Sequence, residues 1–400
     1  MLNEAMRLVS AATVQRLTEQ PQIVTADLMQ YGRAEGDPRF VLALEEFLSR
    51  HYGDKVDRNE LVATGGASST LYHIVTQLFT PSSCTIYCEE TSYMGALEWM
   101  RELDYNIESV KMAPDGIDVE DLKEKLDKRI APELECNDSG CSSVGVTAGP
   151  FTSVLYLIPV FHNPTSATLS EAKAIEIIRL ARKHRLLVVC DDVYNLLRFE
   201  KDGHPPRRLF AFDRKSDADY YGNVISNGSF SKLIAPGIRL GWMELPVWLK
   251  KRLWTKNAAI HSGGCPNTFM SSVIARALEN GSVDRLIHRN IDKLKERLDI
   301  VVREFSERLK RAGCSFEVPK GGYYLWLKLP ANVTAAELLK ETTSTYDLNF
   351  RLGEIFCASE SSRPDVRSHI RVSFASVESS ESIVGAFALV DTIETLSRSK

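Results

Sequence analysis

A single lysine stands in a short turn of small residues between two apolar, strand-like runs within residues 223–243. Lys232 is preceded by Ser229 and Ser231 and followed by an Ala-Pro-Gly turn and Arg239. Most lysines are solvated surface charges, but small, apolar and hydroxyl-bearing surroundings suit a partly desolvated amine that forms a Schiff base. The two hydroxyls and the guanidinium are donors for a phosphate within a few residues of that amine. Pyridoxal 5'-phosphate (PLP) requires both features, so the turn predicts a PLP site, with an ordinary strand-turn-strand as the alternative.

Length and composition limit what such a chain can be. It has 400 residues, a formal net charge of -4, 44% hydrophobic residues and 26% charged residues. This predicts a soluble globular protein of two domains, or one large and one lesser. The charge gives no electrostatic footprint for nucleic acid or a membrane, and no apolar run reaches the roughly 18 residues that span a bilayer. The N-terminal residues lack an apolar signal core and the eight cysteines lack metal-ligand spacing, so we expect a cytoplasmic protein without a metal site.

An uninterrupted apolar run at residues 186–190 (LLVVC) is typical of a strand inside a parallel sheet, and Asp191 and Asp192 follow it directly. A carboxylate at the carboxyl end of such a strand commonly points into the site of an open α/β sheet. Asp191 is therefore placed to pair with the pyridinium nitrogen of PLP, and keeping that nitrogen protonated makes the ring an electron sink. Asp192 is the competing carboxylate.

A second anion site is predicted where a short strand at residues 61–64 meets a helix. Gly65 and Gly66 follow the strand, and Ala67 and Ser68 open the helix. A glycine turn at a helix start presents free backbone N–H groups and the positive end of the helix dipole. A Gly-Gly turn alone is a weak signal for phosphate binding, and it gains weight only beside the lysine turn.

Periodicity and composition predict further elements. Helices are expected at residues 247–259 and 282–312, and the Ser/Gly-rich stretch at residues 133–153 is expected to be a surface loop. Asp37 and Pro38 are expected to begin another amphipathic helix, as its cap and its first residue.

Together these segments resemble the class I and II aminotransferases among the fold-type I PLP enzymes, in the 2-aminoadipate and aromatic branch that includes kynurenine aminotransferases. The likeness runs from about Gln30 to the C-terminus, and the lysine turn is similar to the family's SxSK…PGxRxG signature. It implies an α/β fold with a mostly parallel seven-stranded sheet in a large PLP-binding domain (residues 30–280) and a smaller α+β domain (residues 281–400). Residues 1–29 form an N-terminal segment without the Gly-x-Pro strand of relatives, which leaves substrate binding open.

The resemblance also implies roles for residues around the cofactor ring. Tyr93 takes the place of an aromatic residue that stacks on the pyridine ring. Asn163, in an HNPTS segment where relatives have HNPTG, matches a donor to the phenolic oxygen that also lies beside the substrate. Tyr194 matches the second donor, and its Asp-x-x-Tyr spacing favours Asp191 over Asp192.

Two further residues are carried over from the family. Arg371, the one arginine in an apolar strand at residues 369–375, matches the residue that binds the substrate α-carboxylate in bidentate fashion. Tyr31 matches a tyrosine that crosses to the neighbouring subunit's cofactor phosphate, which implies a homodimer. At the phosphate loop, Ala67 and Ser68 replace a Ser-Gln pair, so backbone donors are kept and one side-chain contact is lost.

The sequence therefore predicts a PLP-dependent aminotransferase that moves an amino group from an L-amino acid to a 2-oxo acid by a ping-pong mechanism. Lys232 is expected to carry the Cα proton of the amino acid. The phosphate is held by Gly66, Ala67, Ser68, Ser229, Ser231 and Arg239. One alternative is a PLP-dependent lyase that performs β-elimination on the same scaffold, which the cofactor motifs do not distinguish. The other is a non-catalytic relative, against which the intact Lys232, Asp191 and Arg371 argue. The sequence does not identify the amino acid donor or the 2-oxo acid acceptor.

Overall fold

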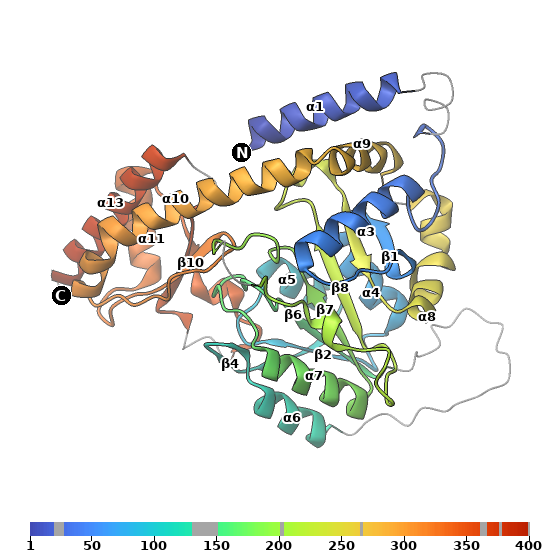
Figure 1. The fold of residues 1–400 in the computed structure, drawn as a ribbon. Coiled ribbons are helices and arrows are strands. Elements are labelled where there is room, and N and C mark those ends of the chain that lie inside the picture. Colours follow the sequence, from blue (N-terminus) through green and yellow to red (C-terminus); the bar gives the residue numbers. More distant parts are fainter. Residues whose placement is uncertain are drawn as a thin grey trace.

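The computed structural model describes residues 1–19, 28–129, 151–200, 204–264, 267–360, 366–375 and 378–398. A seven-stranded sheet is the centre of a large domain, and a three-stranded sheet is the centre of a smaller C-terminal domain (Figure 1). A 30-residue helix, α10 (Ser282–Arg311), runs from one domain to the other. No helix in the described part of the chain is both long enough and apolar enough to cross a membrane.

The large sheet has the strand order β1-β9-β8-β7-β6-β2-β3. Only β9 runs antiparallel to its neighbours, which confirms the mostly parallel seven-stranded sheet expected from the sequence. Its strands are β1 (Leu61–Thr64), β2 (Thr85–Glu89), β3 (Asn106–Val110), β6 (Ser153–Leu157), β7 (Leu186–Asp191), β8 (Val224–Ser229) and β9 (Gly241–Glu244). A small hairpin of β4 (Met112–Ala113) and β5 (Gly116–Ile117) lies apart from it.

Both faces of the large sheet are buried because helices cover them. Alternate residues of β7 show this: Leu186, Val188 and Cys190 belong to one apolar cluster, and Leu187 and Val189 to another. The first cluster includes α6 (Val119–Lys128) and α7 (Glu171–His184). The second includes α3 (Pro38–Tyr52), α4 (Ala67–Leu78), α5 (Met94–Glu102) and α9 (Thr268–Glu279). Strands buried on both sides explain the apolar runs of the sequence.

The α-helices of the small domain pack on one face of its sheet. The antiparallel strands β10 (Tyr324–Lys328), β12 (His369–Ser373) and β11 (Arg351–Leu352) pair in that order. Their apolar face meets α10, α11 (Ala335–Tyr346) and α13 (Ser379–Arg398) around Phe305, Leu327 and Ile370. The opposite face is turned toward the large domain.

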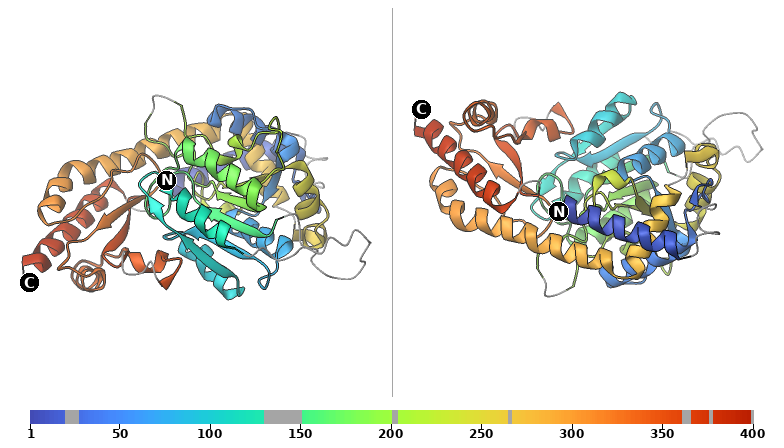
Figure 2. Two further views of the ribbon diagram at one scale, coloured as in Figure 1. Left: turned by 90° about the horizontal axis from the view of Figure 1, so that it is seen from below. Right: turned by 90° about the horizontal axis from the view of Figure 1, so that it is seen from above.

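The N-terminal helix α1 (Leu2–Thr18) lies on the outside of α9 and α10, where Ala5 and Ala12 are buried (Figure 2). As expected, the Asp37 carboxylate caps α3 by accepting from the Phe40 amide at 2.9 Å, with Pro38 in the first turn.

One helix prediction was only partly right, and one loop prediction lies mostly beyond what the structure describes. Residues 247–259 do not form one regular α-helix: α8 (Val247–Lys250) continues as wider π-helical turns over Lys251–Thr255. Of the expected loop at 133–153, residues 133–150 lie outside the described residues.

The lysine turn is fixed by the fit of a glycine against a tryptophan. Gly228 on β8 lies directly opposite Trp242 on β9, and a Cβ at Gly228 would overlap the indole ring. Trp242 is fully buried, so the ring has little room to move. The two strands that carry the turn therefore require glycine at position 228.

We predict that Gly228→Ala lowers the free energy of unfolding by about 1–3 kcal/mol, because overpacking forces buried side chains out of place. Gly237→Ala is the matched control, since a Cβ at Gly237 meets nothing within 4 Å. Urea unfolding of both variants measures the difference. Equal stability of the two variants would show that the contact does not constrain the turn.

Candidate active site

A cavity of about 200 Å³ lies at the carboxyl ends of the parallel strands, where the small domain meets the large sheet. Ten of the residues predicted from the sequence line it: Ala67, Ser68, Tyr93, Asn163, Asp191, Tyr194, Ser229, Ser231, Lys232 and Arg239. Ile158, Val193, Pro236 and Tyr324 complete the wall. The carboxyl edge of an open α/β sheet is where this type of fold binds ligands.

Lys232 is held in a turn that is anchored at both ends. Phe230 is fully buried, its amide donates to the Leu240 carbonyl at 3.1 Å, and its ring packs edge-on against Trp242. The hydroxyl of Tyr323, from the small domain, donates to the Lys232 carbonyl. The backbone is therefore fixed from both domains while the half-buried lysine side chain lines the cavity.

Asp191 is the buried carboxylate of the cavity. It is the last residue of β7 and is 8% exposed. Its Oδ2 accepts from the Tyr156 hydroxyl at 2.8 Å, and its Oδ1 has no hydrogen-bond partner among the described residues. Burial raises the pKa of this carboxyl to about 6, although the Tyr156 hydrogen bond and the charge of Lys232 act in the opposite direction. A buried acceptor with one free oxygen is suited to a cationic donor.

Asp192 is directed elsewhere, because successive strand residues point to opposite faces of a sheet. It does not line the cavity, and its Oδ2 accepts from the Ser226 hydroxyl. The positive charge of Arg208 also acts on it, while Arg208 itself holds Glu244 through two hydrogen bonds of 2.9 and 2.8 Å. Asp192 therefore belongs to a buried polar network outside the cavity, and the preference for Asp191 stays a prediction.

Donors for an anion converge at the start of α4. Gly66 is its N-cap and no side chain caps the helix, so the first backbone N–H groups are left for a ligand. Gly66 has φ +105°, and a Cβ there would lie 3.1 Å from Nη2 of Arg239, so glycine permits both the turn and the close guanidinium. Ser229 and Ser231, whose hydroxyls are 3.0 Å apart, line the same end of the cavity.

Asn163 connects the cavity to the small domain. Its Oδ1 accepts from Nη1 of Arg371 at 2.8 Å, which leaves the Asn163 Nδ2 group as a donor for a ligand. The Arg371 guanidinium lies over the ring of Tyr324 at 4.0 Å and over that of Phe356 at 4.8 Å. Its Nε has no hydrogen-bond partner among the described residues. Aromatic rings fix the position of this guanidinium and leave some of its N–H groups unbonded, so it is suited to bind a carboxylate.

Two tyrosines also line the cavity. Tyr194 is buried with its hydroxyl 3.4 Å from that of Tyr324, and burial raises its pKa well above the usual range. Tyr93 is half-buried at the N-cap of α5, and burial raises its pKa as well, with the negative charge of Asp191 adding to the effect. Both therefore remain neutral hydroxyl groups at neutral pH.

Two predicted features lie at or beyond the edge of the cavity. Tyr31 is 83% exposed and does not line it. Ser166 replaces the family's glycine and has φ +63°, the left-handed conformation that glycine adopts readily. Its hydroxyl donates to the Tyr324 carbonyl at 2.6 Å, so this substitution adds a contact between the two domains.

Sequence reasoning missed Tyr156, Tyr323 and Tyr324. Tyr156 is on β6, which pairs with β7, and its position in an apolar run gave no sign of a polar partner. The Tyr-Tyr pair at the start of β10 follows two glycines, and an aromatic pair at such a turn is the signal that could have pointed to the site. The contacts of all three depend on strand pairing or on the second domain.

Comparisons with known proteins agree with this geometry. The family model described as aminotransferase class I and II matches residues 4–386. Aromatic-amino-acid aminotransferase 1 of Thermococcus litoralis is 26% identical over 369 residues, which cover 92% of this chain and 81% of that protein. The mitochondrial kynurenine/alpha-aminoadipate aminotransferase of Rattus norvegicus is 28% identical over 358 residues, covering 87% and 79%. The solved structure of Pyrococcus horikoshii kynurenine aminotransferase superposes with a TM-score of 0.78 at 25% identity, covering 98% and 87%.

A mostly parallel seven-stranded sheet, with a lysine and a buried aspartate at its carboxyl edge, defines a PLP enzyme of fold type I. The chain belongs to the class I and II aminotransferase family. It is accordingly a PLP-dependent transaminase, and the β-elimination alternative is not favoured.

The residues present fit the cofactor. The Oδ1 of Asp191, which has no hydrogen-bond partner among the described residues, would accept from the protonated ring nitrogen, and the Nδ2 group of Asn163 would donate to the phenolic oxygen. The uncapped start of α4 beside Arg239 is a place for the phosphate. Each polar part of the cofactor thus has a group of matching character at the cavity.

We predict a pH-dependent stability that comes from Asp191. In the cofactor-free protein its folded pKa of about 6 exceeds the ordinary value of 3.8, so the folded state holds a proton that the unfolded state has released. Its contribution to the free energy of unfolding therefore falls, on the order of 3 kcal/mol, as pH rises from about 4 to about 6. In Asp191→Asn this contribution is absent. Urea unfolding of both proteins from pH 4.5 to 7 should give diverging curves, and parallel curves would contradict the prediction.

Proposed function

We propose that Lys232, Asp191 and Arg371 carry the transamination chemistry, with an α-amino acid and a 2-oxo acid as the two substrates. The observation behind this proposal is their arrangement: a lysine amine and a buried carboxylate line one cavity, and the arginine reaches it through Asn163. When bound, PLP supplies an electron-withdrawing ring that makes the Cα–H bond of an amino acid acidic.

Lys232 would act on that proton. Its Nζ would accept the Cα proton of the bound amino acid. Asp191, ionised beside a cationic ring nitrogen, keeps that nitrogen protonated. Asn163 and Tyr194 hold the phenolic oxygen through hydrogen bonds, and Tyr93 covers one face of the ring and excludes water from it.

Gly66, Ala67 and Ser68 would hold the phosphate through the backbone N–H groups of the α4 N-terminus, with Ser229, Ser231 and Arg239 as side-chain donors. Arg239 also donates to the Gly65 carbonyl at 3.0 Å, which fixes the guanidinium beside the glycine turn before α4. These donors would keep the cofactor in the cavity independently of Lys232.

Arg371 would bind the α-carboxylate of every substrate. Its strand alternation places it on the face of the small sheet that is turned toward the cavity, and Asn163 fixes one of its terminal nitrogens. The names of the relatives suggest aromatic amino acids and 2-aminoadipate as donors.

The experiment that tests transamination is a single turnover without acceptor. We predict that an excess of amino acid donor releases one equivalent of 2-oxo acid per subunit and then stops, because the amino group stays on the cofactor. Addition of 2-oxoglutarate should restart the release. Continued 2-oxo acid and ammonia formation without an acceptor would instead identify a lyase.

The enzyme is further proposed to be a homodimer in which Tyr31 reaches the partner's cofactor phosphate. Tyr31 is 83% exposed and Met29 beside it is also exposed, so both side chains are accessible to a second subunit. A cytoplasmic location is also proposed, since the five described cysteines are buried and form no disulfide with one another, which suits a reducing compartment.

We predict that Tyr31→Phe weakens PLP binding about tenfold, the effect of losing one hydrogen bond to a charged group. Tyr346→Phe, another exposed tyrosine, is the control and should change nothing. Cofactor titration gives the affinities and sedimentation gives the mass. A monomeric enzyme, or equal affinities of the two variants, would refute the role of Tyr31.

A further inference from the structure

Two arginines stand opposite each other on neighbouring strands of the small sheet. Arg351 on β11 pairs in register with Arg371 on β12. Residues directly opposite in an antiparallel pair point to the same face, with Cα atoms about 4.5–5.5 Å apart. Arg351 therefore extends to the same side of the sheet as the proposed α-carboxylate ligand.

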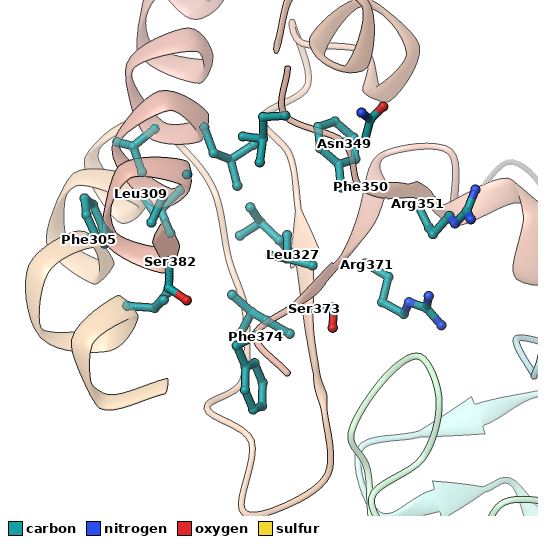
Figure 3. Close-up of a pocket in the computed structure, with 18 of the residues that line it drawn as sticks. Phe305, Leu309, Leu327, Asn349, Phe350, Arg351, Arg371, Ser373, Phe374 and Ser382 are labelled. Atoms are coloured by element: carbon teal, nitrogen blue, oxygen red, sulfur yellow. The ribbon is translucent and has the colours of Figure 1, made fainter. Parts of the chain in front are cut away.

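The burial pattern of both strands agrees with this placement. Phe350 and Leu352 belong to the apolar core of the small domain, as do Ile370 and Val372, so the arginine between each pair lies on the opposite face. Figure 3 shows the side chains of Arg351 and Arg371 on the side of the sheet away from Phe305, Leu309 and Leu327. The core side of the sheet is thus apolar and its other side carries two guanidinium groups.

Arg351 has no carboxylate of its own. It is exposed, and no hydrogen bond or ion pair joins its side chain to another described residue. Other arginines of the small domain differ: Arg308 pairs with Asp391 and Glu394, and Arg367 lies 3.9 Å from Glu354.

The pair is unfavourable without an anion. Like charges directly opposite each other in a sheet are destabilising. Burial lowers the pKa of Arg371, and the positive charge of Arg351 lowers it further. A ligand with two negative groups would turn this repulsion into two charge-assisted contacts.

We propose that Arg351 binds the side-chain carboxylate of a dicarboxylic amino acid or 2-oxo acid whose α-carboxylate is held by Arg371. This inference rests on the proposed role of Arg371. The Cα atoms of two arginines at directly opposed strand positions lie about 5 Å apart. This separation suits two carboxylates that are joined through a short chain of methylenes. Arg351 is then the residue that distinguishes dicarboxylic substrates from apolar ones of equal length.

The test compares two six-carbon amino acids that differ only at the end of the chain, L-2-aminohexanedioate and L-2-aminohexanoate. Single-turnover titrations of the PLP-loaded enzyme report their apparent affinities. Calorimetry with hexanedioate and hexanoate, which cannot react, reports binding alone. We expect Arg351→Ala to weaken both dicarboxylates roughly ten- to hundredfold, and to change the two monocarboxylates less than about threefold.

Two other variants serve as comparisons. Arg367→Ala removes an exposed positive charge from the same domain and should leave all four ligands unaffected. Arg371→Ala should weaken all four. Arg351 is exposed, so its replacement leaves the fold intact, which circular dichroism verifies.

The inference is overturned if Arg351→Ala weakens dicarboxylates and monocarboxylates equally, which would mean that both arginines hold one α-carboxylate. It is also overturned if neither class changes, or if the wild-type enzyme binds hexanedioate no better than hexanoate. Failure of the proposed function gives a different result: no 2-oxo acid forms from either amino acid, while the hexanedioate calorimetry still reports on Arg351.

Discussion

The burial of one carboxylate at the carboxyl end of β7 is the constraint on which the site depends. Asp191 is almost wholly removed from water, and its Oδ1 has no partner among the described residues. Such a group is costly unless a cation meets it. Tyr156 on the neighbouring strand satisfies the other oxygen, and the charge of Lys232 acts on it from the next turn along the sheet. A positively charged ring nitrogen at Oδ1 would offset this cost, which is why we propose Asp191 as its partner.

The site is also shared between two domains. Tyr323 donates to the Lys232 carbonyl, Ser166 donates to the Tyr324 carbonyl, and Arg371 donates to Asn163. These hydrogen bonds join the large domain, which carries the proposed cofactor ligands, to the small sheet, which carries the proposed substrate ligand Arg371. A displacement of the small domain would therefore change the position of the arginines relative to the lysine, and substrate recognition depends on how the domains meet.

Much of the fold and of the candidate site could be predicted, because local sequence patterns indicate the strands and turns that form them. Apolar runs that end in polar residues located the strands and the carboxyl edge of the sheet, and a glycine turn located the start of α4. Tyr156 and Tyr324 could not be predicted, because a strand pattern shows which face a residue occupies and not which residue lies across from it. The π-helical turns after α8 were also missed, because apolar spacing over residues 247–259 does not distinguish wider helical turns from regular ones. The division between domains at residue 281 stays a prediction, since α10 contributes Leu298 to one core and Phe305 to another.

We propose Lys232 as the residue to which the cofactor is joined. Borohydride reduction of the PLP-loaded enzyme, followed by proteolysis and mass spectrometry, tests it directly because reduction makes the bond permanent. We expect the added mass on the peptide that contains Lys232, and on no other. Added mass on a different lysine, with Lys232 unmodified, would contradict the arrangement of the site described above.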